Sequence, residues 1–272
     1  MLKGFASQGH LPYAQFMSNL PVFLIGGAGP VAPREFAALI ARLDPARQAV
    51  PLDMVVFHGN PPAPDFSMVT ETTSLLRAVD ATASCRGHLF GYSGGAAVAL
   101  AFACAHPERV ASLTLEEVAW IGSDGATELE MSFWLELMTT MALEPYEALR
   151  GFRELMVLPQ VSATLPMVPP DSPWIASLVN GVRASIGAFG RAEVDWTVLE
   201  AALFPVYALV GSLSNPVFEL RSRRLANRIT RTRVDVFEGL HHVLPPHRAA
   251  PEDLAARLQA IWIEAELSNK AL

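Results

Sequence analysis

The short segment 91–95, with the sequence Gly-Tyr-Ser-Gly-Gly, constrains the fold of this chain more than any other feature. It follows residues 88–90, an apolar run that predicts a strand, and precedes the alanine-rich run 96–105, which predicts a helix. A serine between glycines in this strand–turn–helix context is typical of a nucleophile elbow, a tight turn that exposes the serine hydroxyl above a sheet. Ser93 is therefore the candidate nucleophile.

An elbow of this kind makes two demands on its residues. Ser93 must adopt a strained backbone conformation, and the flanking glycines must lack a Cβ where strand and helix approach closely. We therefore expect any larger residue at Gly91 or Gly95 to clash with the backbone of this turn. The alternative interpretation is that the small residues only permit a tight turn and that the hydroxyl has no chemical role.

Length and composition favour one large core and a small-molecule substrate. The chain has 272 residues, of which 51% are hydrophobic, enough to bury a single core that carries one insertion. Its 20 basic and 27 acidic residues give a net charge of −7, which disfavours a nucleic acid or an anionic membrane as partner. The oligomeric state is left open by these features.

The cysteines and the N-terminus predict a cytoplasmic protein. Cys85 and Cys104 fall in or beside apolar helical segments, where free thiols of a reducing compartment are expected rather than a disulfide. Residues 1–20 lack the charged start and the continuous apolar stretch of a secretory signal. The longest helical apolar run, 96–105, is about half the roughly 20 residues that a membrane span requires.

Strand-like and helix-like segments alternate along most of the chain. This alternation predicts an α/β fold, a doubly wound and mostly parallel sheet with right-handed crossovers. Beyond residue 118 the pattern changes to helices and a proline-rich turn, so we expect residues 119–202 to form an inserted helical cap and residues 1–118 and 203–272 to form the core. The predicted strands are 21–25, 54–57, 88–90, 110–115, 206–210 and 233–237.

A serine hydroxyl needs a base to remove its proton, and histidine is the usual one. His242 follows the last predicted strand in the loop 238–242. The carboxyl ends of parallel strands meet at one edge of a sheet, so this loop can bring an imidazole over Ser93. His241 is the neighbouring alternative, and both side chains cannot point into one site. The spacing of His241, His242 and His247 matches no common zinc pattern, so no metal is predicted.

The base in turn needs an acid that fixes its tautomer. The loop 211–216, after the strand 206–210, contains no carboxylate, whereas Glu116 and Glu117 follow the strand 110–115. Side chains alternate along a strand, so only one of the two glutamates can face the histidine. The alternative is that a glutamate here caps the strand in solvent, and we expect this of Glu116.

A rival interpretation concerns the loop after the first strand. Residues 27–32 fit the dinucleotide fingerprint G-x-G-x-x-A, which also requires an acidic residue at the end of the next strand. Asp53 starts the predicted strand 54–57 instead of ending it. The nucleotide interpretation is therefore disfavoured, and no cofactor is predicted.

Two further clusters allow two interpretations each. A group of arginines indicates either an anionic partner or, as is commoner for such spacing, a solvated helix face. Several large apolar residues indicate either cap-to-core packing or the lining of a substrate pocket, in which case the substrate is apolar. The arginines are Arg221, Arg223, Arg224, Arg228, Arg231 and Arg233, the apolar helix face carries Met131, Trp134, Met138 and Met141, and the candidate pocket residues are Tyr92, Trp120, Trp134 and Met138.

The run 91–120, the loop 26–29 and the segment 239–254 resemble the α/β-hydrolase superfamily. The haloalkane dehalogenases, one branch of it, carry their triad acid as a glutamate at the end of strand six, and the resemblance places this acid on Glu117, eight residues after Arg109. The chain departs from that branch at Ser93, where those enzymes have an aspartate. Halide displacement and epoxide opening are thereby disfavoured, and serine acyl chemistry remains.

The resemblance also implies an oxyanion hole. Its donors are the backbone N–H of Gly94 and, by match to the family's H-G-x loop, that of Ala28, while Gly26 replaces the family's histidine. The sequence thus predicts a serine hydrolase that cleaves an ester or related acyl bond of a small, largely apolar substrate with Ser93, His242 and Glu117. Two alternatives remain, a cofactor-free lyase or cyclase that uses the same serine and histidine for proton transfer, and a non-catalytic ligand-binding homologue.

Overall fold

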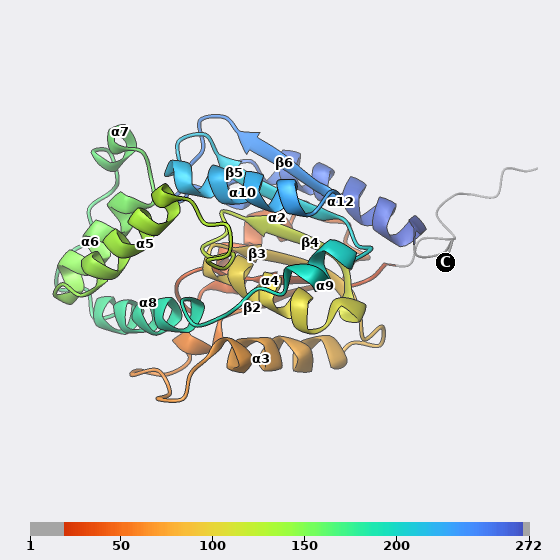
Figure 1. The fold of residues 1–272 in the computed structure, drawn as a ribbon, viewed down its shortest axis with the longest axis horizontal. Coiled ribbons are helices and arrows are strands. Elements are labelled where there is room, and N and C mark those ends of the chain that lie inside the picture. Colours follow the sequence, from red (N-terminus) through yellow and green to blue (C-terminus); the bar gives the residue numbers. More distant parts are fainter. Residues whose placement is uncertain (1–18, 269–272) are drawn as a thin grey trace, which may run out of the picture.

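The computed structural model describes residues 19–268, which form a parallel sheet with helices on both faces (Figure 1). Within this part of the chain the sheet has six strands in the order β2-β1-β3-β4-β5-β6. The predicted α/β class with parallel strands is confirmed. The strands are β1 (Val22–Ile25), β2 (Ala49–Leu52), β3 (Gly87–Tyr92), β4 (Val110–Glu116), β5 (Val206–Gly211) and β6 (Thr232–Phe237).

Apolar side chains bury both faces of the sheet. One face packs against α3 (Met68–Asp80), α4 (Gly94–Ala105) and α10 (Pro216–Arg228), and the other against α2 (Ala37–Ile40) and α12 (Pro251–Ser268). The central strands β3 and β4 are buried along their whole length, as expected for strands covered on both sides. Short helices α1 (Ala32–Glu35) and α11 (Pro246–Ala249) complete the second face.

Between β4 and β5 the described chain consists of helices joined by loops. Helices α5 (Glu128–Met141), α6 (Pro145–Leu155), α7 (Pro159–Ser162) and α8 (Ile175–Phe189) gather at one end of the sheet (Figure 1). The helix α9 (Trp196–Ala201) instead packs against α4. The exact cap boundaries, 119–202, stay a prediction.

The strand predicted at 54–57 is wrong. The strand β2 comes earlier in the chain and pairs in parallel with β1, while Val55–Phe57 forms a 3₁₀ turn. The turn is buried because the side chain of Glu71 accepts hydrogen bonds from the N–H groups of Val55 and Val56, at 2.9 and 3.0 Å. A carboxylate thus satisfies backbone donors that a strand would have paired with a neighbour.

Between residues 19 and 268 no helix combines the length and the apolar character needed to cross a membrane.

Candidate active site

The elbow has the strained geometry that the sequence predicts. Ser93 joins β3 to α4 with φ 54° and ψ −116°, a left-handed conformation that is unfavourable for serine. A Cβ on Gly91 would lie 2.4 Å from the carbonyl oxygen of Gly95, and a Cβ on Gly95 would lie 2.3 Å from that of Ile25. The clash expected at both glycines is confirmed.

Glu117 lies beside His242. Its Oε2 is 3.4 Å from Nδ1 of His242, and its Oε1 accepts hydrogen bonds from the N–H of Gly211 and the hydroxyl of Ser214, each at 2.6 Å. The carboxylate is fully buried, so these two donors replace the water that it has lost. Glu117 has φ 53°, which is also left-handed backbone. The strand thus ends in a strained residue that turns its carboxylate towards the histidine.

Glu116 faces the opposite side of the sheet and contacts a different histidine. Its Oε2 is 2.5 Å from Nδ1 of His247, and its Oε1 accepts a hydrogen bond from the N–H of His247 at 3.2 Å. The expectation that Glu116 caps the strand in solvent is wrong, since its side chain is fully buried. The reason is that α11 covers this face of the sheet and brings His247 to the strand end.

The neighbouring histidines of the last loop differ in orientation. His242 is 4% exposed, and its ring stacks on Phe218 with 4.5 Å between the ring centroids. Its carbonyl oxygen accepts a hydrogen bond from the hydroxyl of Tyr92 at 2.5 Å. His241 instead accepts a hydrogen bond at Nδ1 from the N–H of Leu244, in its own turn, and partial burial lowers its pKa. The geometry therefore favours His242 over His241 as the partner of the glutamate.

Ser93 and His242 are linked through Tyr92 and make no direct hydrogen bond in the described chain. Among residues 19–268 the Ser93 hydroxyl forms no hydrogen bond to the imidazole, although the preceding residue, Tyr92, contacts His242 through both its hydroxyl and its ring. The N–H of Ser93 donates to the carbonyl oxygen of Glu116 at 2.9 Å, which ties the elbow to the strand that carries the acid. Catalytic hydrogen bonds are often long in free enzymes and shorten when substrate binds.

Two backbone donors lie next to Ser93 on the wall of one cavity. Gly94 is the first residue of α4, so its N–H has no acceptor within the helix. The N–H of Ala28 makes no hydrogen bond to any residue in the described part of the chain. Both predicted oxyanion donors are thus free to bind a substrate oxygen.

Glu35 organises the loop that contains Gly26. Its Oε2 accepts a hydrogen bond from the N–H of Gly27 at 3.1 Å. A Cβ on Gly26 would lie 3.0 Å from this oxygen, so a side chain at that position would compete with the carboxylate for space. Burial raises the pKa of Glu35 above its ordinary value. The sequence reading missed Glu35, and its one signal was an acidic residue in the helix after the loop.

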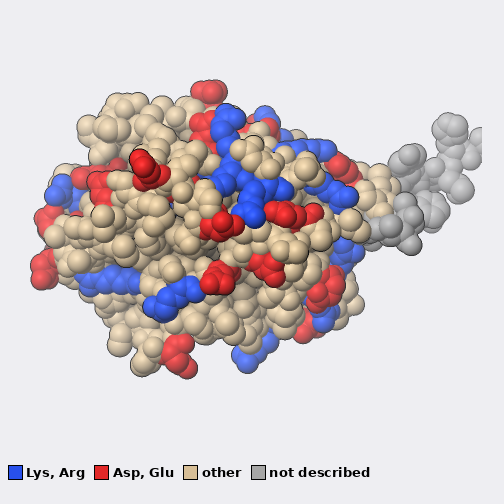
Figure 2. All heavy atoms as spheres, in the orientation of Figure 1, with Lys and Arg blue, Asp and Glu red and all other residues tan. Residues whose placement is uncertain are grey.

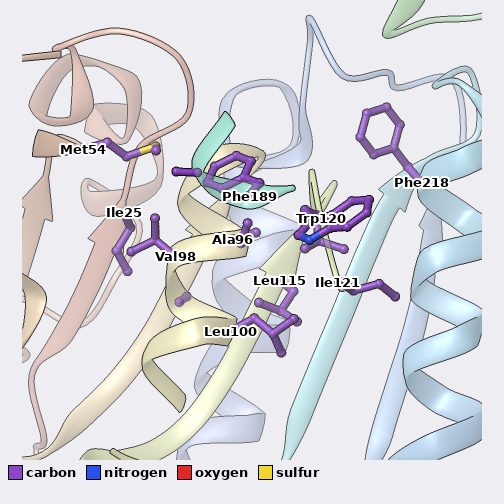
Figure 3. Packing of buried hydrophobic residues seen from close by; sticks show 14 of the residues in the cluster. Ile25, Met54, Ala96, Val98, Leu100, Leu115, Trp120, Ile121, Phe189 and Phe218 are labelled. Carbon is purple, nitrogen blue, oxygen red and sulfur yellow. The ribbon is translucent and has the colours of Figure 1, made fainter. Parts of the chain in front are cut away.

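The cavity beside Ser93 is lined mainly by apolar side chains from the sheet end and from the cap helices. Its volume is about 50 Å³. In Figure 3, Met54, Phe189 and Phe218 lie above the strand ends, beyond the deeper core residues Leu100 and Leu115. The lining residues from the cap are Phe133, Trp134, Leu137, Phe152, Met156, Val182, Ser185, Ile186 and Phe189.

Of the four candidate pocket residues, the cavity is lined by Trp134, and the other three lie elsewhere in the described structure. Trp120 packs behind Trp134, with ring centroids 4.4 Å apart. Tyr92 is buried on the other face of the sheet, among the residues that pack against α2 and α12. Met138 is 43% exposed, because consecutive helical residues face different directions and Leu137 takes the position on the cavity wall.

Asp53, the acidic residue considered in the nucleotide interpretation, does not lie where the sequence predicts. Asp53 directly follows β2, so the prediction that it starts the strand is wrong. Its Oδ1 accepts a hydrogen bond from the N–H of Ala32, the first residue of α1, at 2.7 Å. One oxygen of the carboxylate is therefore engaged at the helix start.

The arginine cluster divides into exposed and buried members. Arg223, Arg228 and Arg233 lie at the surface in ion pairs with Glu219, Asp124 and Glu264. Figure 2 shows that basic and acidic side chains are intermixed on the visible face. Arg221 departs from the expected solvated face, because it is 1% exposed and lines the cavity.

Solved structures place this architecture among known folds. An α/β hydrolase from Sphaerobacter thermophilus shares 20% identity with a TM-score of 0.65, over 89% of this chain and 92% of that chain. A thermophilic esterase from Thermogutta terrifontis shares 20% identity with a TM-score of 0.66, over 91% and 90% of the two chains. MenH from S. aureus shares 18% identity with a TM-score of 0.64, over 92% and 96%. This chain has the α/β-hydrolase fold.

The sequence matches no protein-family model and no curated protein. At identities near 20% the likeness shows the fold and leaves the reaction to be argued from the residues. In this α/β-hydrolase fold, Ser93, Glu117 and His242 follow three different strands, β3, β4 and β6, at the edge of the sheet covered by the helical insertion.

Proposed function

We propose that the protein is a serine hydrolase that cleaves an ester or related acyl bond of a small, largely apolar molecule. The observation that carries the proposal is the pairing of Glu117 with His242 beside a strained elbow serine. Two free backbone donors and an apolar cavity at the same serine support it further. The esterase and hydrolase among the structural neighbours are consistent with this chemistry.

In the proposed reaction His242 takes the proton of Ser93 as Oγ attacks the acyl carbon. The N–H groups of Ala28 and Gly94 hold the oxyanion that develops, and His242 then gives its proton to the leaving alcohol. Water, activated by the same imidazole, releases the acyl group from Ser93. Glu117 fixes the tautomer of His242 and stabilises the imidazolium, while Gly211 and Ser214 hold the carboxylate in place.

The cavity sets the class of substrate. Side chains such as Met54, Trp134 and Phe189 offer dispersion contacts and no hydrogen bonds to most of the bound molecule. Each buried methylene contributes about 0.8 kcal/mol to binding. We therefore expect turnover to rise from acetyl to butyryl esters of the same alcohol.

A fluorophosphonate probe tests the proposal directly. It should label the protein stoichiometrically at Ser93, as read by peptide mass spectrometry, and Ser93→Ala should remain unlabelled and should not hydrolyse p-nitrophenyl butyrate. A protein that stays unlabelled would rule out an activated serine. Absent ester turnover together with a reaction that still requires His242 would instead select proton-transfer chemistry of the lyase or cyclase kind. Retained ligand binding with no effect of Ser93→Ala on any activity would select the non-catalytic alternative.

A further inference from the structure

Arg221 is buried at the wall of the candidate active-site cavity. Its side chain comes from α10 and is 1% exposed. Among the described residues that line the cavity it is the one member with a formal charge, since all the others are apolar residues, glycines or serines. A lone buried cation in an apolar wall is costly unless something pairs with it.

The hydrogen bonds of Arg221 involve Nη1 and leave the buried Nη2 without a partner among the described residues. Nη1 donates to the carbonyl oxygen of Ala119 at 2.6 Å and more weakly to that of Val118 at 3.4 Å. Nη2 is buried and makes no hydrogen bond with any residue between 19 and 268. A buried donor left unsatisfied costs about 1 to 3 kcal/mol, and more when it is charged.

The charge of Arg221 is also incompletely neutralised. The nearest carboxylate is Glu130, whose Oε1 lies 3.9 Å from Nε of Arg221 and only 2.9 Å from Nη2 of Arg224. Two guanidinium groups therefore share one carboxylate. Burial lowers the pKa of Arg221 to about 10, so it still carries its charge at neutral pH. One positive charge next to the cavity has no carboxylate of its own.

The position of the guanidinium connects it to the candidate catalytic residues. It lies over the rings of Phe133 and Phe218, with its central carbon 5.2 and 5.9 Å from the ring centroids. Both rings line the cavity, and Phe218 also stacks on His242. One aromatic ring therefore separates the unmatched charge from the imidazole.

We propose that Arg221 binds a carboxylate of the substrate, so that the natural substrates are acyl compounds with an apolar body and one anionic group apart from the bond that is cleaved. The proposal rests on the serine hydrolase function proposed above. A carboxylate is planar and carries one charge, which matches the unpaired Nη2 and the single unmatched positive charge. A phosphate dianion would need a second cation, which the described lining residues do not provide.

Two matched esters test this inference. p-Nitrophenyl hexanoate and mono-p-nitrophenyl adipate have the same leaving group and the same six-carbon acyl chain, and the second carries a terminal carboxylate. We expect a kcat/KM about 10- to 100-fold higher for the anionic ester, as is typical of a hydrogen bond to a charged group. The glutarate and suberate monoesters, one carbon shorter and two longer, locate the best distance.

Variants of α10 then assign the preference to Arg221. Arg221→Met should lower kcat/KM for the adipate monoester about tenfold more than for the hexanoate ester, and Arg221→Lys should keep part of the preference. Arg223→Met removes an exposed charge from the same helix and should change neither. An equal loss on both esters in Arg221→Met would overturn the proposal, since it would assign Arg221 to holding the carbonyl groups after β4. A wild-type enzyme that prefers the neutral ester at every chain length would also overturn it.

A binding measurement covers the case in which Arg221→Met does not fold. Ser93→Ala protein should be stabilised against heat by monomethyl adipate at about tenfold lower concentration than by methyl hexanoate. Equal stabilisation by the two ligands would contradict the proposal. This readout does not require catalysis, so it decides on Arg221 even if Ser93 is not labelled by a fluorophosphonate and the hydrolase function fails.

Discussion

The consecutive glutamates at the end of β4 each pair with a histidine, and the two pairs have opposite surroundings. Glu117 and His242 lie beside the elbow serine, where the carboxylate also accepts two hydrogen bonds of 2.6 Å and the contact with the imidazole is 3.4 Å. Glu116 and His247 lie on the other face of the sheet, fully buried, with 2.5 Å between them. The shorter and more deeply buried pair has no access to the cavity.

This difference teaches that burial and pairing alone do not identify a catalytic pair. His247 is enclosed by Phe36, Phe90 and Tyr92, with ring centroids 4.8 to 6.3 Å away, so no substrate can reach it. We interpret its pair as one that holds α11 against the sheet. The pair near Ser93 is the one that can exchange a proton with a bound molecule.

Replacing each histidine in turn should separate the two roles most strongly. His242→Ala should lower kcat for an aryl ester by about 10⁴- to 10⁶-fold, since the serine loses its base. His247→Ala should destabilise the protein by about 3 kcal/mol or more, because it leaves the charge of Glu116 buried and unpaired. Steady-state kinetics and urea unfolding of both variants measure the two effects, and a larger kinetic loss in His247→Ala would reverse the assignment.

The two glutamates should give the same contrast with smaller effects. Glu117→Gln keeps the shape but loses the charge that stabilises the imidazolium, so kcat should fall by about 10² to 10⁴. Glu116→Gln should change kcat per folded molecule by no more than a fewfold and should lower the unfolding free energy by about 1 to 3 kcal/mol. Equal losses of kcat in the two variants would contradict the assignment of Glu117 alone as the acid that acts on His242.

A third histidine–glutamate pair, His88 with Glu266, allows a structural role to be tested through the pH dependence of stability. Nε2 of His88 lies 3.1 Å from Glu266, and burial lowers the pKa of His88 from 6.5 to about 4. Because the folded pKa is depressed, the unfolded chain takes up the proton first as pH falls, and stability is lost between pH 6.5 and 4. The loss should reach about 3 kcal/mol at the acid end, at 1.36 kcal/mol for each pKa unit.

Unfolding by urea at a series of pH values measures this effect as the difference between wild type and His88→Gln. The wild-type curve alone is not sufficient, because burial also raises the pKa values of Glu35 and Glu71. Protonation of these two carboxylates stabilises the folded state as pH falls, which opposes the effect of His88. Parallel curves for the two proteins across this window would show that His88 is not the titrating group. The ratio of kcat in the two proteins should stay constant with pH.

The smallest expected effect concerns two neighbouring apolar residues that also face opposite ways. Leu137→Ala removes part of the cavity wall and should therefore raise KM for a butyryl ester by about 3- to 30-fold. Met138→Ala removes an exposed side chain and should change stability by no more than about 0.5 kcal/mol. KM values for both variants, with the unfolding midpoint as control, check this; a larger KM change in Met138→Ala would show that the cap closes differently around substrate.

Features that neighbouring residues specify could be predicted from the sequence, whereas the placement of side chains by tertiary contacts could not. The elbow of Ser93 and the strand that carries Glu117 were visible in short segments, because local periodicity and glycine spacing specify them. The positions of Glu35, Asp53 and Arg221 were not, since each side chain is placed by a contact outside its own helix or loop, 8, 21 and 102 residues away along the chain. Arg221 lies at helical spacing from the buried Phe218 and Leu225, but its charge favoured a solvated position, and the packing of α10 against the chain after β4 buries it.

For a related reason, the sequence could not distinguish Leu137, which lines the cavity, from Met138, which is exposed. A helix with apolar residues on several sides does not reveal which side faces a cavity, and the cap helices resolve this only when they pack together. The strand predicted at 54–57 failed similarly, because the side chain of Glu71 satisfies its backbone and a turn becomes stable.

The central claim is that the pair Glu117 and His242 activates Ser93 to form a covalent acyl intermediate. Mixing the protein with p-nitrophenyl butyrate, quenching with acid at successive times and mapping the adduct by peptide mass spectrometry tests this most directly. A butyryl group should appear on Ser93 before steady state, be absent from Ser93→Ala and form far more slowly in His242→Ala. Full turnover of the ester with no acyl group on Ser93 at any time would contradict the account.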